Sequence, residues 1–169
     1  MRKNLVLLGM MAVGKTTLGK IVAKKQGLEF IDIDANIEVK YSMKISEIFK
    51  KKGEKFFRIN EEKEVLNSLK KKNCVIALGG GAFINKIIRN NVLGNAISIW
   101  LDIDLITLNK RIKWNKNRPL LNKENNEKKI RKIKIILIIK FLLIMFLRAL
   151  GCNLSCIIVQ LYLHSKNKT

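Results

Sequence analysis

The segment near the N-terminus that could do the most chemistry reads GMMAVGKT and covers residues 9–16. It fits the P-loop pattern, in which two glycines bracket a variable stretch and a lysine and a hydroxyl residue follow. An apolar run at 4–8 and a helical pattern at 16–26 flank it, so the turn should connect a buried strand to a helix. Backbone N–H groups and the helix N-terminus would bind phosphates, with Lys15 at the β- and γ-phosphates and Thr16 on magnesium. The pattern predicts binding of a nucleoside triphosphate without specifying which kinase or triphosphatase this is.

Two acids close the next apolar run, which reads LEFIDID at 28–34. We predict that this run is a strand, so that Asp32 and Asp34, two residues apart, lie on the same side of its end. One carboxylate could hold the hydration shell of magnesium, and the other could accept a proton from a substrate hydroxyl. The alternative is that these acids only cap the helix that follows.

Three later clusters add to this chemistry. Arg58 ends the segment GEKFFR on a predicted helix, where its fork suits a carboxylate, although a plain surface charge is the alternative. The triple glycine at 79–81 offers a bare backbone that a small ligand can approach, or else a simple tight turn. Arg118 lies in the basic loop NRPLL, where a mobile arginine could close on the transferring phosphoryl group or remain a solvated charge.

The elements that must position these residues alternate between strands and helices. We predict strands at 4–8, 28–34, 73–81 and 95–102, and helices at 16–26, 35–72 (broken near Gly53) and 104–117. This alternation predicts an α/β fold with a mostly parallel sheet. Ligands of such sheets bind at the carboxyl ends of the strands. The clusters at 9–16, 32–34 and 79–81 all fall at that edge.

The composition excludes several other kinds of site. A formal net charge of +21 could indicate a nucleic-acid partner, but the excess of Lys, Asn and Ile along the whole chain favours an AT-rich codon bias. The three cysteines, Cys74, Cys152 and Cys156, form neither a disulfide framework nor a four-ligand zinc set, and His164 is the single histidine. No secretory pattern opens the chain, so we expect a cytoplasmic protein.

In this order, the motifs resemble those of the shikimate kinase family: a short P-loop, Asp-x-Asp, Gly-Glu-x-x-Phe-Arg, Gly-Gly-Gly and Arg-Pro-Leu-Leu. The resemblance covers about residues 1–133. It implies a three-layer P-loop kinase fold, with a five-stranded parallel sheet flanked by helices. It also implies transfer of the γ-phosphoryl group of ATP to the 3-hydroxyl of shikimate, in the pathway to chorismate and the aromatic amino acids.

The resemblance also implies a role for each matched residue. The ATP-binding residues would be Gly9, Ala12, Val13, Gly14, Lys15, Thr16, Thr17 and Arg118. Thr16 would ligate Mg²⁺, with Asp32 near it. Asp34 would hold the shikimate hydroxyls and favour proton removal, and Arg58 would bind the carboxylate. The ring hydroxyls would contact Gly79, Gly80 and Gly81, and Lys15, Asp34 and Arg118 would be the catalytic residues.

The chain departs from the family at two places. The family usually has glycine where this chain has Ala12, which is costly only if the backbone needs a positive φ. After Arg118 the family has an Arg-x-x-x-Tyr helix, a fifth strand and an adenine-contacting loop. Residues 134–169 instead form an apolar and basic tail without Asp or Glu. Three explanations are possible for this tail: a shift of reading frame, a membrane segment, or a diverged part of the fold. If the reading frame has shifted, we expect a poor enzyme that lacks the fifth strand.

Other functions remain open at this stage. Another small-molecule P-loop kinase, similar to gluconate kinase, would share the phosphate-binding turn. An inactive nucleotide-binding remnant would retain ATP binding alone, and a nucleic-acid binder is supported by charge alone. We expect a monomer that binds ATP, Mg²⁺ and shikimate, and neither nucleic acid nor a membrane.

Overall fold

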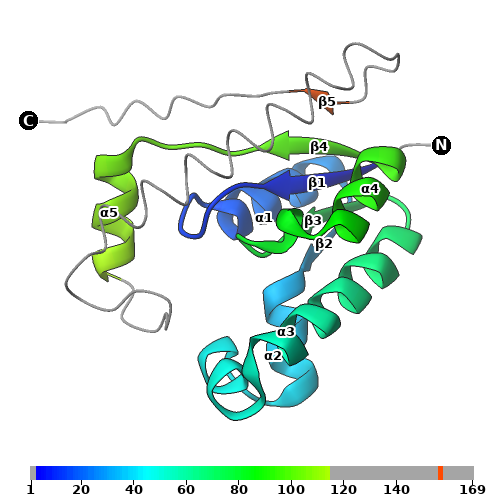
Figure 1. Cartoon of the computed structure of the whole chain (residues 1–169). Coiled ribbons are helices and arrows are strands. Elements are labelled where there is room, and N and C mark those ends of the chain that lie inside the picture. The colour runs from blue at the N-terminus through cyan, green and yellow to red at the C-terminus, as the bar shows by residue number, and fades with distance from the viewer. Residues whose placement is uncertain (1–2, 115–155, 158–169) are drawn as a thin grey trace, which may run out of the picture.

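The structure is a computed structural model, and it describes residues 3–114 and 156–157. Strands and helices alternate along the chain (Figure 1). The elements are β1 Asn4–Leu8, α1 Lys15–Gln26, β2 Glu29–Asp32, α2 Ile33–Tyr41, α3 Ile45–Lys70, β3 Cys74–Ala77, the 3-10 helix η1 Ala82–Ile84, α4 Lys86–Asn95, β4 Ala96–Trp100, α5 Leu105–Trp114 and β5 Cys156–Ile157. The predicted α/β class is therefore confirmed.

The strands form one parallel sheet in the order β2-β3-β1-β4-β5. In the centre, Leu5 is in register with Val75 on one side and with Ile97 on the other. Because every pair is parallel, the carboxyl ends of β1, β2 and β3 meet at one edge. That edge carries the P-loop, the two acids and the triple glycine.

Both faces of the sheet are covered, which is why the strands are almost continuously apolar. On one face, Leu7 and Val75 pack with Ala23 of α1. On the other face a larger core includes Val6 and Ile76, together with residues from α2, α3, α4 and α5. Figure 1 shows α1 and α4 on opposite sides of the sheet. The result is the predicted three-layer arrangement.

Several predicted boundaries are wrong. The strand expected at 28–34 ends at Asp32, and α2 begins at Ile33. The helix expected at 35–72 is interrupted at Ser42, which has a φ of 49°, and it kinks where predicted, at Gly53. The sequence analysis missed α4, although Asn85 caps it by accepting hydrogen bonds from the backbone N–H groups of Ile87 and Ile88.

The tail contributes two described residues to the sheet. Cys156–Ile157 pairs in parallel with Ser98 and Ile99 of β4, so our expectation of a missing fifth strand is wrong at these positions. The rest of 134–169 lies outside the described residues, so the structure does not test the three explanations for the tail. Within the described part of the chain, no helix is both long and apolar enough to cross a membrane.

Close packing between α1 and the sheet generates a prediction. A side chain on Gly19 would collide with the Phe30 ring and come within 3.2 Å of Leu7 Cδ1, whereas the space beside Gly94 in α4 is open. Gly19→Ala should therefore lower the free energy of unfolding by about 1–3 kcal/mol through overpacking. Gly94→Ala should raise it by up to about 1 kcal/mol through helix propensity. Urea unfolding of both variants tests this, and equal effects would contradict the packing argument.

Candidate active site

The P-loop is held in place by backbone packing and by Lys15. A side chain on Gly9 would collide with the carbonyl oxygen of Leu101, so only glycine fits there. Gly14 is the N-cap of α1 and has a φ of 102°, and no side chain of the described residues caps this helix N-terminus. Lys15 Nζ donates hydrogen bonds to the carbonyls of Gly9 and Met10, both at 2.8 Å. The turn thus presents an uncapped helix N-terminus and a cation together, which is the arrangement that binds phosphate.

Ala12 adopts the conformation that favours glycine. Its φ is 64°, in the left-handed region, so alanine in place of the family's glycine is costly here. That conformation costs a residue with a Cβ roughly 1–2 kcal/mol. Arg111 of α5, which the sequence analysis did not single out, donates to the carbonyls of Ala12 and Val13 at 3.4 Å each. A second cation thus contacts the outer part of the turn.

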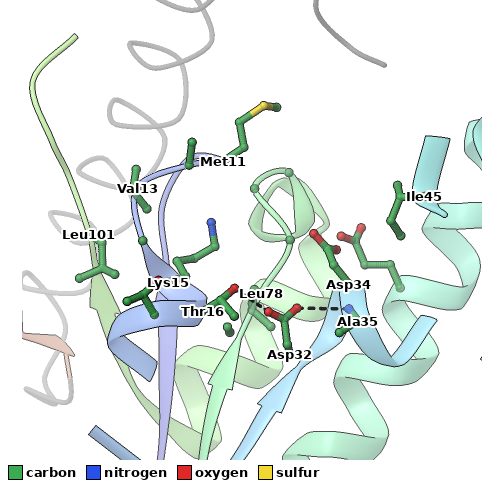
Figure 2. A pocket seen from close by; sticks show the side chains of 18 of the residues that line it. Met11, Val13, Lys15, Thr16, Asp32, Asp34, Ala35, Ile45, Leu78 and Leu101 are labelled. Atoms are coloured by element: carbon green, nitrogen blue, oxygen red, sulfur yellow. Dashed lines mark hydrogen bonds between the residues drawn. The ribbon is translucent and has the colours of Figure 1, made fainter. Parts of the chain in front are cut away.

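Asp32 has two roles at the end of β2. Its Oδ2 accepts a hydrogen bond from Thr16 Oγ1 at 2.6 Å, and its Oδ1 caps α2 by accepting from the backbone N–H of Ala35 at 3.3 Å (Figure 2). The capping alternative therefore holds for Asp32. The prediction that it shares a strand end with Asp34 is wrong, because Asp34 lies in the first turn of α2.

The oxygens of Thr16 and Asp32 fit a magnesium site. Both are hard donors, and they are in direct contact. Within the described residues, no group of three or more His, Cys, Asp or Glu side chains could hold a metal ion. Mg²⁺ is commonly bound by few protein ligands together with waters and substrate phosphates. The donor set here suits that mode.

The triple glycine brings acids and arginine together. A side chain on Gly79 would collide with Glu61 Oε1 and lie 2.9 Å from Asp34 Oδ1. A side chain on Gly81 would lie 3.1 Å from the Arg58 guanidinium. Only glycine fits at the first residue of this turn, and the predicted approach of a small ligand to its backbone stays a prediction. The nearest neighbours of Gly79 and Gly81 are side chains of the site, and those of Gly80 are backbone atoms of the P-loop.

Arg58 is paired with two glutamates of its own helix. Its Nη1 donates to Glu61 Oε2 at 2.8 Å, and its Nε and Nη2 each donate to Glu54 Oε1 at 3.2 Å. The Glu61 side chain is only 2% exposed, whereas that of Glu54 is 63% exposed. Burial lowers the pKa of Arg58, but Glu61 and Glu54 outweigh it and raise that pKa above its usual value. Sequence reasoning missed Glu61, although its spacing of three from Arg58 on a helix was a usable signal.

One cavity of about 950 Å³ joins these parts. It is lined by P-loop residues at one end and by Asp34, Arg58, Glu61 and the triple glycine at the other. Figure 2 shows Lys15, Thr16, Asp32 and Asp34 around it. The P-loop and the cluster of Asp34, Arg58 and Glu61 thus share one space, as a group transfer between two ligands would require.

The comparisons with known proteins decide the family. The model of the family described as shikimate kinase matches residues 11–136. The shikimate kinase of Bartonella henselae is 46% identical over 131 residues, which cover 78% of this chain and 62% of the relative. The chain belongs to the shikimate kinase family. The Bacillus subtilis enzyme is 40% identical over 138 residues, which cover 76% of this chain and 74% of that enzyme.

Solved shikimate kinases share the fold. The enzyme from Acinetobacter baumannii, determined in complex with shikimate, has a TM-score of 0.75 and 37% identity, covering 79% of this chain and 74% of that one. A gluconokinase from Sinorhizobium meliloti, at 13% identity and a TM-score of 0.51, shares the fold alone. The chain spans less than two thirds of the length of the two Bartonella shikimate kinases it matches, 62% and 63%.

Most residues expected at a shikimate kinase site line the same cavity. The residues found there are Ala12, Val13, Gly14, Lys15, Thr16, Thr17, Asp32, Asp34, Arg58, Gly79, Gly80 and Gly81. Gly9 lies at the base of the turn, where Lys15 bonds its carbonyl. Arg118 lies outside the described residues. The individual roles of these residues stay predictions.

The strained P-loop alanine gives a test. Ala12→Gly should raise the free energy of unfolding by about 1 kcal/mol, because the left-handed conformation then costs less. Affinity for Mg-ATP should change little, because the turn already has this conformation before a ligand binds. Ser42→Gly is the matched control, since Ser42 has a φ of 49° but lies at the C-cap of α2. It should gain stability without a change in nucleotide affinity. Urea unfolding and ATP titration measure both, and a free energy of unfolding that does not rise in Ala12→Gly would contradict the argument.

Proposed function

We propose that this chain catalyses the ATP-dependent phosphorylation of shikimate at its 3-hydroxyl, which gives shikimate 3-phosphate and ADP. The observation that supports it best is the single cavity that combines an uncapped P-loop helix with Asp34 and Arg58. Membership of the shikimate kinase family favours shikimate over gluconate as the substrate, because the similarity to the gluconokinase extends to the fold alone. We further propose a cytoplasmic monomer in the pathway to chorismate and the aromatic amino acids, without a nucleic-acid partner.

At the phosphate end of the cavity, the chain supplies positive charge and fixed donors. The P-loop backbone and the Lys15 ammonium would bind and orient the ATP phosphates, which is most of what phosphoryl transfer requires from a protein. Thr16 and Asp32 would hold Mg²⁺, which neutralises negative charge on the phosphates when it is bound. The described part of α5 adds Arg111 beside the turn. Arg118 would close on ATP from the loop that follows.

At the acid end, Asp34 and Arg58 would orient shikimate. The Arg58 guanidinium would bind the substrate carboxylate, because its planar fork can hold two oxygens at once. Asp34 would accept the hydrogen bond of the attacking hydroxyl and favour removal of its proton. Gly79–Gly81 leaves room for the ring hydroxyls to approach the backbone. The acceptor would therefore meet the phosphate end in a fixed orientation.

Two substitutions test the division of the cavity. Lys15→Ala should abolish detectable binding of Mg-ATP, because the charge beside the phosphates is lost. Asp34→Asn should lower turnover by roughly a hundred-fold, the low end for loss of acid–base catalysis, while ATP affinity changes little. ATP titration and an ADP-release assay with shikimate or gluconate measure these effects. Preference for gluconate would overturn the proposed substrate, and equal loss of both properties in Asp34→Asn would indicate misfolding instead.

The tail generates a separate prediction. The shikimate kinase pattern has an arginine, four residues before a tyrosine, that no residue after Arg118 matches. A charge-assisted contact of that kind contributes about 1.5–3 kcal/mol. Turnover of this chain should therefore be roughly ten- to a hundred-fold below that of a version carrying the family's C-terminal helix. The same ADP-release assay compares them, and equal turnover would show that 134–169 substitutes for the missing contact.

A further inference from the structure

Glu61 is a buried carboxylate, and the described residues form a hydrogen bond with only one of its two oxygens. Its Oε2 accepts a hydrogen bond from Arg58 Nη1 at 2.8 Å. Its Oε1 is buried against Gly79 and has no hydrogen-bond partner among the described residues. An ionised carboxylate in such a place lacks the solvation that water would give each oxygen. The unpaired oxygen is therefore where a proton would bind.

The charges around Glu61 come from α2 and α3. Arg58 and Glu54 lie on its own helix, Asp34 reaches it from α2, and the glycines at 79–81 bring no titratable side chain. Burial raises the pKa of the Glu61 carboxyl above its usual 4.5, Arg58 opposes this shift, and Asp34 and Glu54 add to it. Arg58 is thus the cationic neighbour that favours the ionised form.

A substrate carboxylate would have to share Arg58 with the groups already on it. The Nε, Nη1 and Nη2 atoms of Arg58 each donate a hydrogen bond to Glu54 or Glu61. Glu54, 63% exposed, can turn into water when a new acid arrives. Glu61, 2% exposed, has no such exit. A substrate carboxylate at Arg58 would therefore share the positive charge that compensates Glu61, while Glu61 stays buried.

We propose that binding of shikimate at Arg58 is coupled to the uptake of one proton by Glu61. The inference rests on the proposed function, because it requires the substrate carboxylate at Arg58. The proton comes from the buffer and forms an O–H bond at Oε1, while Oε2 remains an acceptor for Arg58. No other covalent bond changes. Neutral Glu61 then leaves the charge of Arg58 to the substrate, and the residue acts as a positioning residue, not as the catalytic base.

Titration calorimetry of the full chain with shikimate tests the coupling. Two buffers of different ionisation enthalpy are compared at several values between about pH 5.5 and pH 8, where the substrate carboxyl is ionised. Proton uptake makes the observed enthalpy depend on the buffer, with a slope that approaches one proton per shikimate. Because the complex binds more protons than the free protein, affinity should fall as the pH rises, by up to about tenfold per pH unit.

Two variants identify the group that takes up the proton. Glu61→Gln retains a side-chain oxygen for Arg58 but cannot titrate, so its binding enthalpy should not depend on the buffer. Glu54→Gln is the matched control on the same helix and the same guanidinium, and it should retain the dependence. The dependence surviving in Glu61→Gln would overturn the assignment to Glu61.

The wild-type measurement decides the matter even if Glu61→Gln fails to fold. Binding of shikimate without proton uptake at any pH tested would overturn this inference and leave the proposed function standing. Absence of shikimate binding would overturn the proposed function and the coupling with it. The two failures are thus distinguishable from the same titration.

Discussion

Backbone packing between loops at the carboxyl ends of the strands sets the position of everything else in the site. The Leu101 carbonyl, just after β4, occupies the space that a side chain on Gly9 would need. Beyond β3, a side chain on Gly80 would lie only 3.0 Å from the Met11 nitrogen. The P-loop is thus confined between two neighbouring loops, which the parallel register of β1 with β3 and β4 holds in place. Contacts through backbone leave little freedom, so the two ends of the cavity are oriented before any ligand arrives.

The side chains around Arg58 are acidic, although the chain as a whole is strongly basic. The formal net charge is +21, yet Arg58 is surrounded by Glu54, Glu61 and, through Glu61, Asp34. These acids keep the guanidinium in one orientation at the wall of the cavity, because a buried carboxylate is costly unless its partner stays beside it. Under the proposed function, selectivity for an acid substrate would then depend on one oriented cation, and the lysines elsewhere would contribute attraction without orientation.

The sequence was sufficient for the alternation of strands and helices up to β4, apart from α4, and for most of the residues that line the cavity, because both follow from apolar runs and motif spacing. It failed where a tertiary contact decides a local choice. The apolar Ile33 continues the alternation of a strand, so the pattern extends β2 beyond Asp32, and capping by the acids was only the alternative. The structure ends β2 at Asp32, where the carboxylate both caps α2 and accepts a hydrogen bond from Thr16. Glu61 was missed because a charged residue on a helix is ordinarily solvated. Its spacing from Arg58 indicates an ion pair, but its burial beside Gly79 comes from tertiary packing. The α4 helix was missed although Asn85 provided a usual N-cap signal.

Cationic side chains explain how the P-loop keeps its shape with an alanine in the left-handed region. Lys15 bonds two carbonyls at the start of the turn, and Arg111 bonds those of Ala12 and Val13. Because a peptide is planar and trans, the N–H on the far side of each bonded carbonyl points the opposite way. Each carbonyl that a cation holds therefore also fixes the direction of the N–H group in the same peptide. Strain at one residue persists when its neighbours over-determine the backbone, and the buried Val13 side chain with four tethered carbonyls does so here.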